Sequence, residues 1–312
     1  MSDFVRHNSS QMNDVCAVVV TYHPDLSILG RLIGATKSQV GQIVLVDNGS
    51  KPEIVAQLKR LSIEEGLQLC LFDSNRGLGA AHNQGIQIAI SQGFEYVLLL
   101  DQDSEPASDM VQHLHLAHQR LSVNTHVAAV GPCFIDPVSG HRSRFVRFGR
   151  IRFQPIACSE DDDIIRADFL ISSGSLISIA ALESIGHMDE SLFIDHVDTE
   201  WCLRAAKKGW PVYGVCKAEM FHRLGDEGIH IPLMRSRRIA VHSPLRHYYI
   251  YRNSVRLILT RGVSWQWRVN DIYRLTGILL VFLVFAPLRL KRLKNIVHGI
   301  WHGILGVKGP IP

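Results

Sequence analysis

The chain has 312 residues, of which 46% are hydrophobic and 20% are charged. This composition can bury a substantial core and excludes a disordered tail, while a mean hydropathy of +0.09 is too low for a protein of several membrane spans. The charge is uneven: residues 231–312 hold 14 of the 33 Lys and Arg but one acid, Asp271. Such a basic part favours phosphate, in lipid headgroups or in nucleic acid.

The six cysteines are scattered along the chain and include no C-x-x-C pair. This spacing argues against a disulfide framework or a cysteine zinc site, and it favours a reducing compartment. The first fifteen residues are polar and contain no apolar run, so we expect no secretory signal.

Short apolar runs alternate with helical patterns through the first hundred residues. The expected strands cover residues 15–21, 42–47, 67–73 and 95–101, and the expected helices cover 26–37, 52–65 and 78–92. This alternation predicts parallel strands with helices on both faces. Farther along, the patterns predict helices over 107–121, 180–186, 199–208 and 254–305, strands over 127–136, 164–179 and 211–217, and a loop over 137–163.

Acidic residues stand where three of the expected strands end. Two strands run directly into Asp47 and Asp101, and a third ends at Asp73. In an open α/β sheet, ligands bind beyond the carboxyl ends of the strands, so this pattern predicts a nucleotide-like ligand there. The sequence lacks G-x-x-x-x-G-K-[ST], and no G-x-G-x-x-G follows the first strand, so a P-loop enzyme and a dinucleotide dehydrogenase both fit poorly.

The strongest local signal is Asp101-Gln102-Asp103, which follows the apolar run EYVLLL. Two carboxylates at positions i and i+2 of a strand end can face one site. Their hard oxygen atoms suit Mg²⁺ or Mn²⁺, which bind substrate phosphates through one or two carboxylates. An isolated Asp-x-Asp is equally typical of a turn, so its place at the end of a buried strand matters.

The C-terminal part combines an apolar run, a basic run and tryptophans. The apolar run from Leu275 is 12 residues long. As a helix it would extend roughly 18 Å, short of the ~30 Å hydrocarbon core. The basic stretch 289–294 follows it, and Trp265, Trp267 and Trp301 suit the headgroup level. These features predict an interfacial segment on an anionic membrane surface; the alternative is a buried packing helix with a solvated basic flank.

Taken in order, six motifs resemble the family 2 inverting glycosyltransferases of the GT-A fold: VVTYHP, VDNGS, NRGLGAAHNQG, LLLDQDS, SSGSL and FIDHVDTEWCLRA. Within that family they are most similar to the rhamnosyltransferases of bacterial surface polysaccharide (lipopolysaccharide O-antigen) synthesis. The resemblance covers roughly residues 14–225. It implies a GT-A type α/β domain over 1–250, with a mostly parallel central sheet flanked by helices, and a helical, membrane-associating extension over 251–312.

The resemblance also implies a donor site. Thr21 and Tyr22 would line the base pocket, and Asp47 would accept a hydrogen bond from a pyrimidine imide. The residues that would border the nucleotide and its diphosphate are Asn75, Arg76, Gly79 and Asn83. Ser173 and Gly174 would shape the wall between donor and acceptor. A turn, a helix start or a strand bulge would explain several of these residues equally well.

For the metal, the resemblance implies Asp103 as a direct ligand of Mg²⁺ or Mn²⁺, and Asp101 near the ribose or a metal-bound water. His222 occupies the place of a further ligand. The metal would neutralise the departing nucleotide diphosphate. Arg223 would assist, and residues 224–240 would form a mobile lid.

For the catalytic base, alignment on the CLR of FIDHVDTEWCLRA implies Asp198. In an inverting transfer one carboxylate takes the proton of the acceptor hydroxyl while the nucleotide leaves from the opposite face. Asp198 would equally suit the cap of the expected helix 199–208. Two non-acidic residues precede it where many relatives carry an acid, so Asp195 and Glu200 stay as alternative bases. Glu200 is also spaced to pair with Arg204 on the helix surface.

The resemblance therefore implies transfer of L-rhamnose from dTDP-L-rhamnose to a lipid-linked oligosaccharide, by a cytoplasmic protein on the inner face of the cell membrane. No nucleic-acid partner is expected. The alternatives are a transferase of another nucleotide-activated sugar, a sugar-phosphate nucleotidyltransferase, and a basic adaptor without catalysis. The last alternative leaves Asp101, Asp103 and Asp198 without a role.

Overall fold

The structure is a computed structural model of the chain. It describes residues 11–137, 140–159, 162–222, 228–230, 238–240, 243–285 and 287–312, with the backbone alone described for 222, 228–230 and 238–240.

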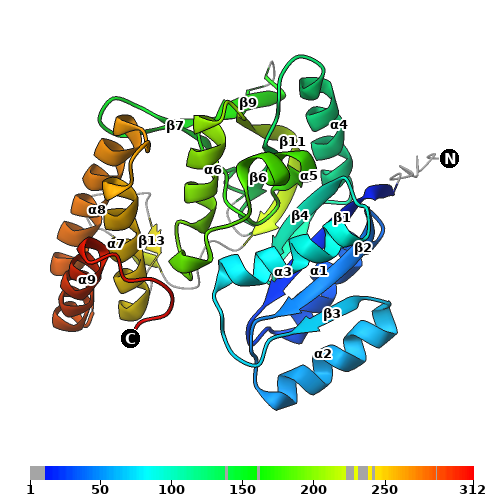
Figure 1. The fold of residues 1–312 in the computed structure, drawn as a ribbon, viewed down its shortest axis with the longest axis horizontal. Helices are drawn as coiled ribbons and strands as arrows, with labels where there is room; N and C mark the ends of the chain where they lie inside the picture. The colour runs from blue at the N-terminus through cyan, green and yellow to red at the C-terminus, as the bar shows by residue number, and fades with distance from the viewer. Residues whose placement is uncertain are drawn as a thin grey trace.

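A twisted central sheet organises the molecule (Figure 1). Its strands are β1 (Met12–Thr21), β2 (Val40–Asp47), β3 (Gln68–Leu71), β4 (Tyr96–Asp101), β5 (Ser104–Pro106), β6 (Ala129–Ile135), β9 (Ile164–Ala167), β10 (Leu176–Ser178) and β11 (Val212–His222). The strand order is β3-β2-β1-β4-β10-β6-β11-β5, with β9 beside β11. The long strands all run one way, and the short strands β5, β9 and β10 run against their neighbours. The expected mostly parallel sheet is confirmed.

Helices cover both faces of this sheet, as the alternating pattern predicts. They are α1 (Leu26–Lys37), α2 (Pro52–Glu65), α3 (Leu78–Ser91), α4 (Met110–Ser122), α5 (Ile179–Ile185), the 3₁₀ turn η1 (Glu190–Leu192) and α6 (Val197–Lys207). Alternate residues of β1 point to opposite sides. Val15, Ala17 and Val19 pack with α1, α2 and α4, whereas Val18 and Val20 pack with α3, α5 and α6. Both sides of the sheet are therefore buried, which explains its uninterrupted apolar strands.

Two sequence-based boundaries in the middle of the chain were wrong. The expected strand 164–179 is two strands, β9 and β10, because the chain turns at Gly174, whose φ is +80°. A Cβ at Gly174 would lie 2.5 Å from the ring of Pro132, so a larger residue would not fit there. The expected loop 137–163 contains a hairpin of β7 (Phe145–Phe148) and β8 (Phe153–Ile156).

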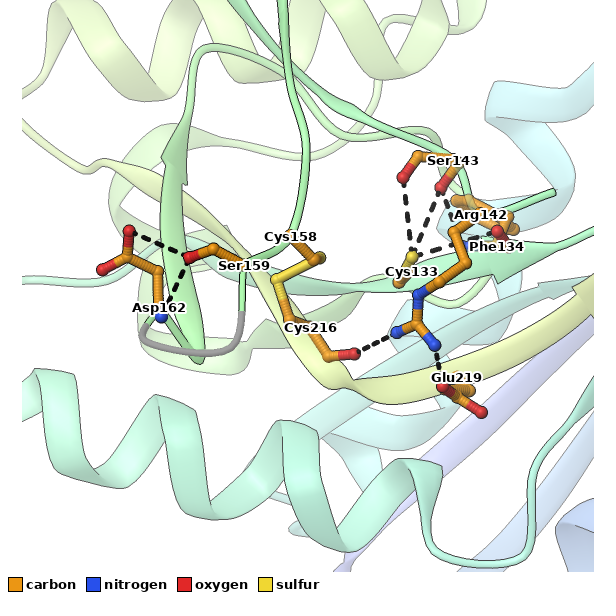
Figure 2. Close-up of a disulfide and its surroundings, with 9 residues drawn as sticks. All are labelled: Cys133, Phe134, Arg142, Ser143, Cys158, Ser159, Asp162, Cys216 and Glu219. Atoms are coloured by element: carbon orange, nitrogen blue, oxygen red, sulfur yellow. Dashed lines mark hydrogen bonds and ion pairs between the residues drawn. A yellow bond between two sulfur atoms is a disulfide. The ribbon is translucent and has the colours of Figure 1, made fainter.

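A disulfide joins Cys158, just after that hairpin, to Cys216 on β11 (Figure 2). The two Cα atoms are 5.7 Å apart, although 58 residues separate them in sequence. Arg142 reinforces the same region, since its guanidinium donates to the carbonyl of Cys216 at 2.9 Å and pairs with Glu219. The expectation of cysteines without disulfides was therefore wrong for this pair. Scattered spacing could not reveal it, because the sheet rather than the local sequence brings the two residues together.

Three helices form the C-terminal part: α7 (Pro244–Leu259), α8 (Trp265–Phe285) and α9 (Arg289–Ile304). The helical stretch begins ten residues before the expected start at 254, with Ser243 capping α7 by accepting from the Arg246 N–H. The boundary expected after residue 250 thus falls inside α7. A Cβ at Gly299 would lie 2.4 Å from the Tyr248 carbonyl oxygen, so α9 packs closely on α7. Within the described residues, none of the helices is both long and apolar enough to span a membrane.

Candidate active site

A cleft of about 590 Å³ opens beyond the carboxyl ends of β1 and β4. Asp195, one of the alternative bases, lines it together with five residues assigned from the sequence: Tyr22, Asn75, Asp101, Asp103 and Asp198. The last of these lies almost one hundred positions after Asp101 and Asp103, on the first turn of α6. The fold therefore brings the Asp-x-Asp motif and the predicted base to one cavity, at the edge of the sheet where the sequence placed a ligand.

The Asp-x-Asp motif is held by hydrogen bonds on both of its sides. The Asp101 N–H donates to the Ser173 hydroxyl at 2.9 Å, and that hydroxyl lies 2.8 Å from the Ser104 hydroxyl. On the other side, Gln102 bonds the backbone of Tyr22 twice, accepting from its N–H at 2.7 Å and donating to its carbonyl at 3.3 Å. Ser173 and Gln102 thus fix the direction of the Asp101 backbone between them.

The cleft concentrates negative charge at Asp101. Burial, together with the negative charges of Asp103 and Asp198, raises the pKa of this carboxyl from its usual value near 3.8 to about 7. Arg246, from the first turn of α7, opposes this effect. The Asp101 carboxyl thus lies within the electrostatic influence of two other carboxylates.

Asp198 is the second residue of α6, and His196 is the N-cap residue of this helix. Its Oδ1 accepts from the Thr199 N–H at 2.7 Å and lies 3.3 Å from the Thr199 hydroxyl. Burial raises the pKa of Asp198, while the Thr199 N–H lowers it. A half-buried carboxylate held still at a helix start, with a raised pKa, suits a general base.

The segment just before Asp198 has an unusual backbone. Phe193, Asp195 and His196 all have positive φ, between 61° and 67°. This conformation is uncommon for residues with a Cβ, and the surrounding structure must hold it. Asn253 of α7 does so, because its amide lies 2.8–3.0 Å from the carbonyl oxygens of Leu192, Ile194 and Asp195.

Arg246 closes one side of the cleft through an ion pair with Asp195. Its Nε and one terminal nitrogen donate to the carboxylate of Asp195 at 2.9–3.2 Å. Both residues line the cavity together with Asp101 and Asp103. A guanidinium that lines a cavity can also donate to a phosphate oxygen, because it carries five N–H groups.

The predicted base-pocket residues lie deeper than the cleft. Asp47 is 0% exposed, and it accepts from the Thr21 hydroxyl at 3.0 Å and from the Ser50 hydroxyl at 2.6 Å. Thr21 is likewise fully buried. Tyr22, in contrast, is 45% exposed and contributes to the cavity wall. Thr21 and Asp47 are therefore buried next to Tyr22 and do not line the cleft themselves.

Two asparagines join the turns that follow β2 and β3. The side chain of Asn48 donates to that of Asn75 at 3.1 Å and accepts from the Arg76 N–H at 2.8 Å. Both asparagines line the cleft. The guanidinium of Arg76 instead lies 4.7 Å from the centre of the Phe72 ring.

Several predicted site residues have structural contacts and, within the described part of the chain, do not line this cleft. Asn83 exchanges hydrogen bonds with the backbone of Met188 at 2.9–3.0 Å. A Cβ at Gly79 would lie 3.2 Å from the Asp189 carbonyl oxygen, so this glycine permits close packing of α3. Glu200 accepts from Arg204 at 2.7 Å. This last pair is the helix-surface alternative that the sequence left open.

Two predicted residues and the expected lid lie largely beyond what the structure describes. The backbone of His222, at the end of β11, pairs in register with Ser104, the residue after Asp103. Arg223 lies outside the described residues, as does most of 224–240, of which the strands β12 (Gly228–His230) and β13 (Arg238–Ala240) pair with each other.

Sequence reasoning missed three residues that contribute to the site: Asn48, Gln102 and Arg246. Asn48 and Gln102 stand inside motifs that were recognised, and the available signal was a side-chain amide directly after the aspartate that ends a strand. Arg246 gave no local signal, because its helix was expected to begin eight residues later and its basic neighbours pointed to membrane lipid.

Comparison with known proteins agrees with this geometry. Residues 16–178 match the family model described as "Glycosyl transferase family 2". The chain is 30% identical over 301 residues to the dTDP-rhamnosyl transferase RfbF of Shigella flexneri, which covers 95% of this chain and 97% of RfbF. It is 23% identical over 205 residues to the low-salt glycan biosynthesis hexosyltransferase Agl10 of Haloferax volcanii, covering 64% of each.

Solved structures share the fold. The structure of GalNAc-T7 with UDP, GalNAc and Mn²⁺ matches with a TM-score of 0.61 at 16% identity, over 90% of this chain and 54% of that one. Residues 1–349 of S. aureus TarS match with a TM-score of 0.56 at 13% identity, over 93% of this chain and 80% of that one. The GT-A type fold is confirmed, and the chain is an enzyme that belongs to glycosyl transferase family 2.

Proposed function

We propose that this enzyme transfers L-rhamnose from dTDP-L-rhamnose, with inversion, to a hydroxyl of a lipid-linked saccharide. The likeness to a dTDP-rhamnosyl transferase over almost the whole chain supports the donor. The observation that carries the proposal is the meeting of Asp101, Asp103 and Asp198 in one cleft. A sugar diphosphate needs cationic neutralisation on one side of its anomeric carbon and a base on the other, and three acids in one cleft support an arrangement of this kind.

In the proposed reaction, Asp198 is the base. The acceptor oxygen forms a bond to the anomeric carbon as the bond from that carbon to the diphosphate oxygen breaks. The hydroxyl proton passes to Asp198, and the electron pair of the broken bond leaves with the nucleotide diphosphate. The raised pKa of Asp198 favours this proton transfer, since a carboxylate of ordinary pKa is a weak base. Asp195 pairs with Arg246 and Glu200 pairs with Arg204, so we assign neither of them the role of base.

The donor side is assigned to residues around the Asp-x-Asp motif. Tyr22 would pack against the base above the buried pair of Thr21 and Asp47. Asn48 and Asn75 would bond the nucleotide, and Arg246 would donate to the diphosphate while it keeps its ion pair with Asp195. Ser173 acts through Asp101, whose N–H it holds.

The residues fit a divalent cation. Asp101 and Asp103 bring hard oxygen atoms and an excess of negative charge to the cleft, as the raised pKa of Asp101 indicates. We propose Asp103 and His222 as ligands, because the backbone of His222 lies in register beside the motif. Mg²⁺ or Mn²⁺ bound there would neutralise charge that develops on the leaving diphosphate.

We also assign the C-terminal helices to an anionic membrane surface on the cytoplasmic side, where a lipid-linked acceptor would be reached. Large apolar side chains are exposed along α8 and α9: Leu280, Leu283, Val284, Phe285, Leu288, Leu290, Val297 and Trp301. Lys291 and Lys294 are exposed among them. An apolar surface edged by lysines has the composition of an interfacial helix, whereas one without charge would favour a protein partner.

The test uses the full chain and a panel of nucleotide sugars in Mg²⁺ or Mn²⁺: dTDP-L-rhamnose, UDP-glucose and GDP-mannose. Water reacts slowly in place of the acceptor hydroxyl. Release of dTDP therefore measures the activity even when the acceptor is not known. We expect dTDP-L-rhamnose to raise the melting temperature most and to be hydrolysed, with inversion of its anomeric configuration by NMR. Asp198→Asn should slow hydrolysis about 10²- to 10⁴-fold and leave donor binding intact.

Preference for another nucleotide sugar would overturn the assigned donor. Hydrolysis of none of them would overturn the proposed function as a whole. Undiminished hydrolysis by Asp198→Asn would remove this residue from the role of base.

A further inference from the structure

A second cavity, of about 290 Å³, adjoins the first one at the proposed base. Ile171, Asp195, His196 and Asp198 line both cavities. Much of the remaining wall of the second cavity comes from the β7–β8 hairpin and from α8, two elements outside the six motifs of the sequence. The Asn270 side chain ties these elements together, since it donates from α8 to the Gly149 carbonyl in the hairpin turn at 2.8 Å.

A buried carboxylate with an unused oxygen lines this second cavity. Asp271 of α8 has a side chain that is 1% exposed, and its Oδ1 accepts from Arg274 at 2.6 and 2.8 Å. Its Oδ2 has no hydrogen-bond partner among the residues that the structure describes. A buried acceptor left unpaired costs folding free energy, so this atom calls for a donor from outside the chain. Asp271 is also the one acidic residue in the basic stretch 231–312.

Aromatic rings contribute to the other walls. Phe153 and Phe169 meet edge to face, with ring centres 6.2 Å apart, and Trp267 meets the ring of His196 in the same manner at 6.0 Å. An apolar pocket with a few buried polar groups is the usual make-up of a small-molecule site. A sugar ring matches it in particular, because it presents an apolar C–H face to aromatic rings and hydroxyl groups at its edge.

We propose that this cavity binds the terminal sugar of the acceptor, and that Asp271 and Arg274 recognise its hydroxyl groups. The inference rests on the proposed function and adds to it the residues that select the acceptor. The volume, at the lower end of the range for small-molecule sites, suits a single sugar ring. Because Asp198 lines both cavities, a sugar held by Asp271 presents a hydroxyl to the base, gives up its proton there and bonds to the anomeric carbon that the diphosphate leaves.

The experiment measures binding of simple sugars to the full chain in the presence of dTDP and Mg²⁺. The probes are the methyl glycosides of glucose, galactose, mannose, rhamnose and N-acetylglucosamine, followed by saturation-transfer NMR. We expect at least one to bind the wild type, and Asp271→Asn to weaken it about 10- to 100-fold, since a hydrogen bond to a charged group is lost. Phe153→Ala, which keeps the ion pair, should weaken the same glycoside.

Asp14→Asn is the matched control, because Asp14 pairs with the buried His115 at 2.7 Å at the opposite end of β1. It should bind the glycoside as the wild type does. If no glycoside binds the wild type, or if neither Asp271→Asn nor Phe153→Ala weakens binding, the acceptor pocket is refuted. If the wild type does not hydrolyse dTDP-L-rhamnose, the proposed function itself is refuted.

Discussion

Asn253 of α7 donates a hydrogen bond of 3.0 Å to the carbonyl oxygen of Asp195, three residues before Asp198. The same amide reaches the carbonyls of Leu192 and Ile194, and Asn253 is fully buried. A residue of the C-terminal helices thus holds the strained segment that leads into the first turn of α6.

Asn253→Ala should therefore reduce both stability and catalysis. It leaves three buried carbonyls without this donor, and we expect a loss of about 1–3 kcal/mol in the free energy of unfolding, measured in urea. The turnover number in donor hydrolysis should fall while the affinity for dTDP changes little, since Asp198 loses its orientation. Asn295→Ala on α9, which removes a bond to the Lys291 carbonyl, is the control. A turnover number equal to that of the control would show that α7 does not position the base.

The pH dependence of transfer should report the burial of Asp198. Only the ionised carboxylate accepts a proton, so kcat/KM should fall as the pH is lowered through the pKa of this group. Because burial raises that pKa, the midpoint of the fall should lie above the usual value near 3.8.

Thr199→Val tests this assignment, because it removes the hydroxyl 3.3 Å from Asp198 Oδ1. A lost hydrogen bond to the ionised form raises the pKa, so the acid limb should move to higher pH by roughly 0.4–1 unit. Thr199→Ser keeps the hydroxyl and should leave the limb in place. An acid limb that is the same in both variants would indicate that another group controls the rate.

Metal binding should depend on Asp103. In Mn²⁺, dTDP should bind the wild type more tightly than in EDTA, and Asp103→Asn should weaken the binding in Mn²⁺ by roughly 10- to 100-fold. In EDTA the two proteins should bind dTDP alike. Asp73→Asn, an exposed aspartate after β3, is the control for a lost negative charge. Isothermal titration calorimetry measures each affinity for dTDP. We expect Asp103→Asn to bind dTDP equally well with and without Mn²⁺.

Membrane association should be electrostatic as well as apolar. Replacing Lys291 and Lys294 with Gln removes two exposed positive charges from α9 and should weaken binding to vesicles containing anionic lipid by about 2 kcal/mol. The difference should shrink as salt is raised from 0.05 to about 0.5 M, because screening weakens charge attraction. Replacing Lys59 and Arg60 on α2 with Gln is the control. If flotation with the vesicles depends on neither the salt concentration nor the two lysines, the α9 surface does not bind anionic lipid through its charge.

The sequence predicted the sheet and the cleft for a physical reason. Apolar β-branched runs that end in Asp47 and Asp101 specify buried parallel strands whose ends meet at one edge, and ordered motifs placed Asp198 beside them. These features are local in the sequence or tied to recognisable motifs, so reading the chain was enough to find them.

What the sequence could not predict depends on contacts between distant segments. Cys158 and Cys216 meet because β11 and the loop after β8 lie side by side. Asn253 and Asp271 look like ordinary polar positions of amphipathic helices, and their roles appear once their neighbours across the fold are known. The periodicity of the C-terminal part likewise gave helices, but it did not show that α7 packs against the loop before Asp198.

Helix α7 contributes to three parts of the molecule. Its Arg246 lines the cleft, its Asn253 bonds the strained segment before α6, and its flank packs against α9. The enzyme therefore cannot be divided into a catalytic half and an exchangeable tail. A hybrid that takes residues 243–312 from a relative with a different acceptor must also take the matching residues 191–196, or the graft will misalign its own base. Acceptor preference and catalytic competence are in this way inherited as one unit.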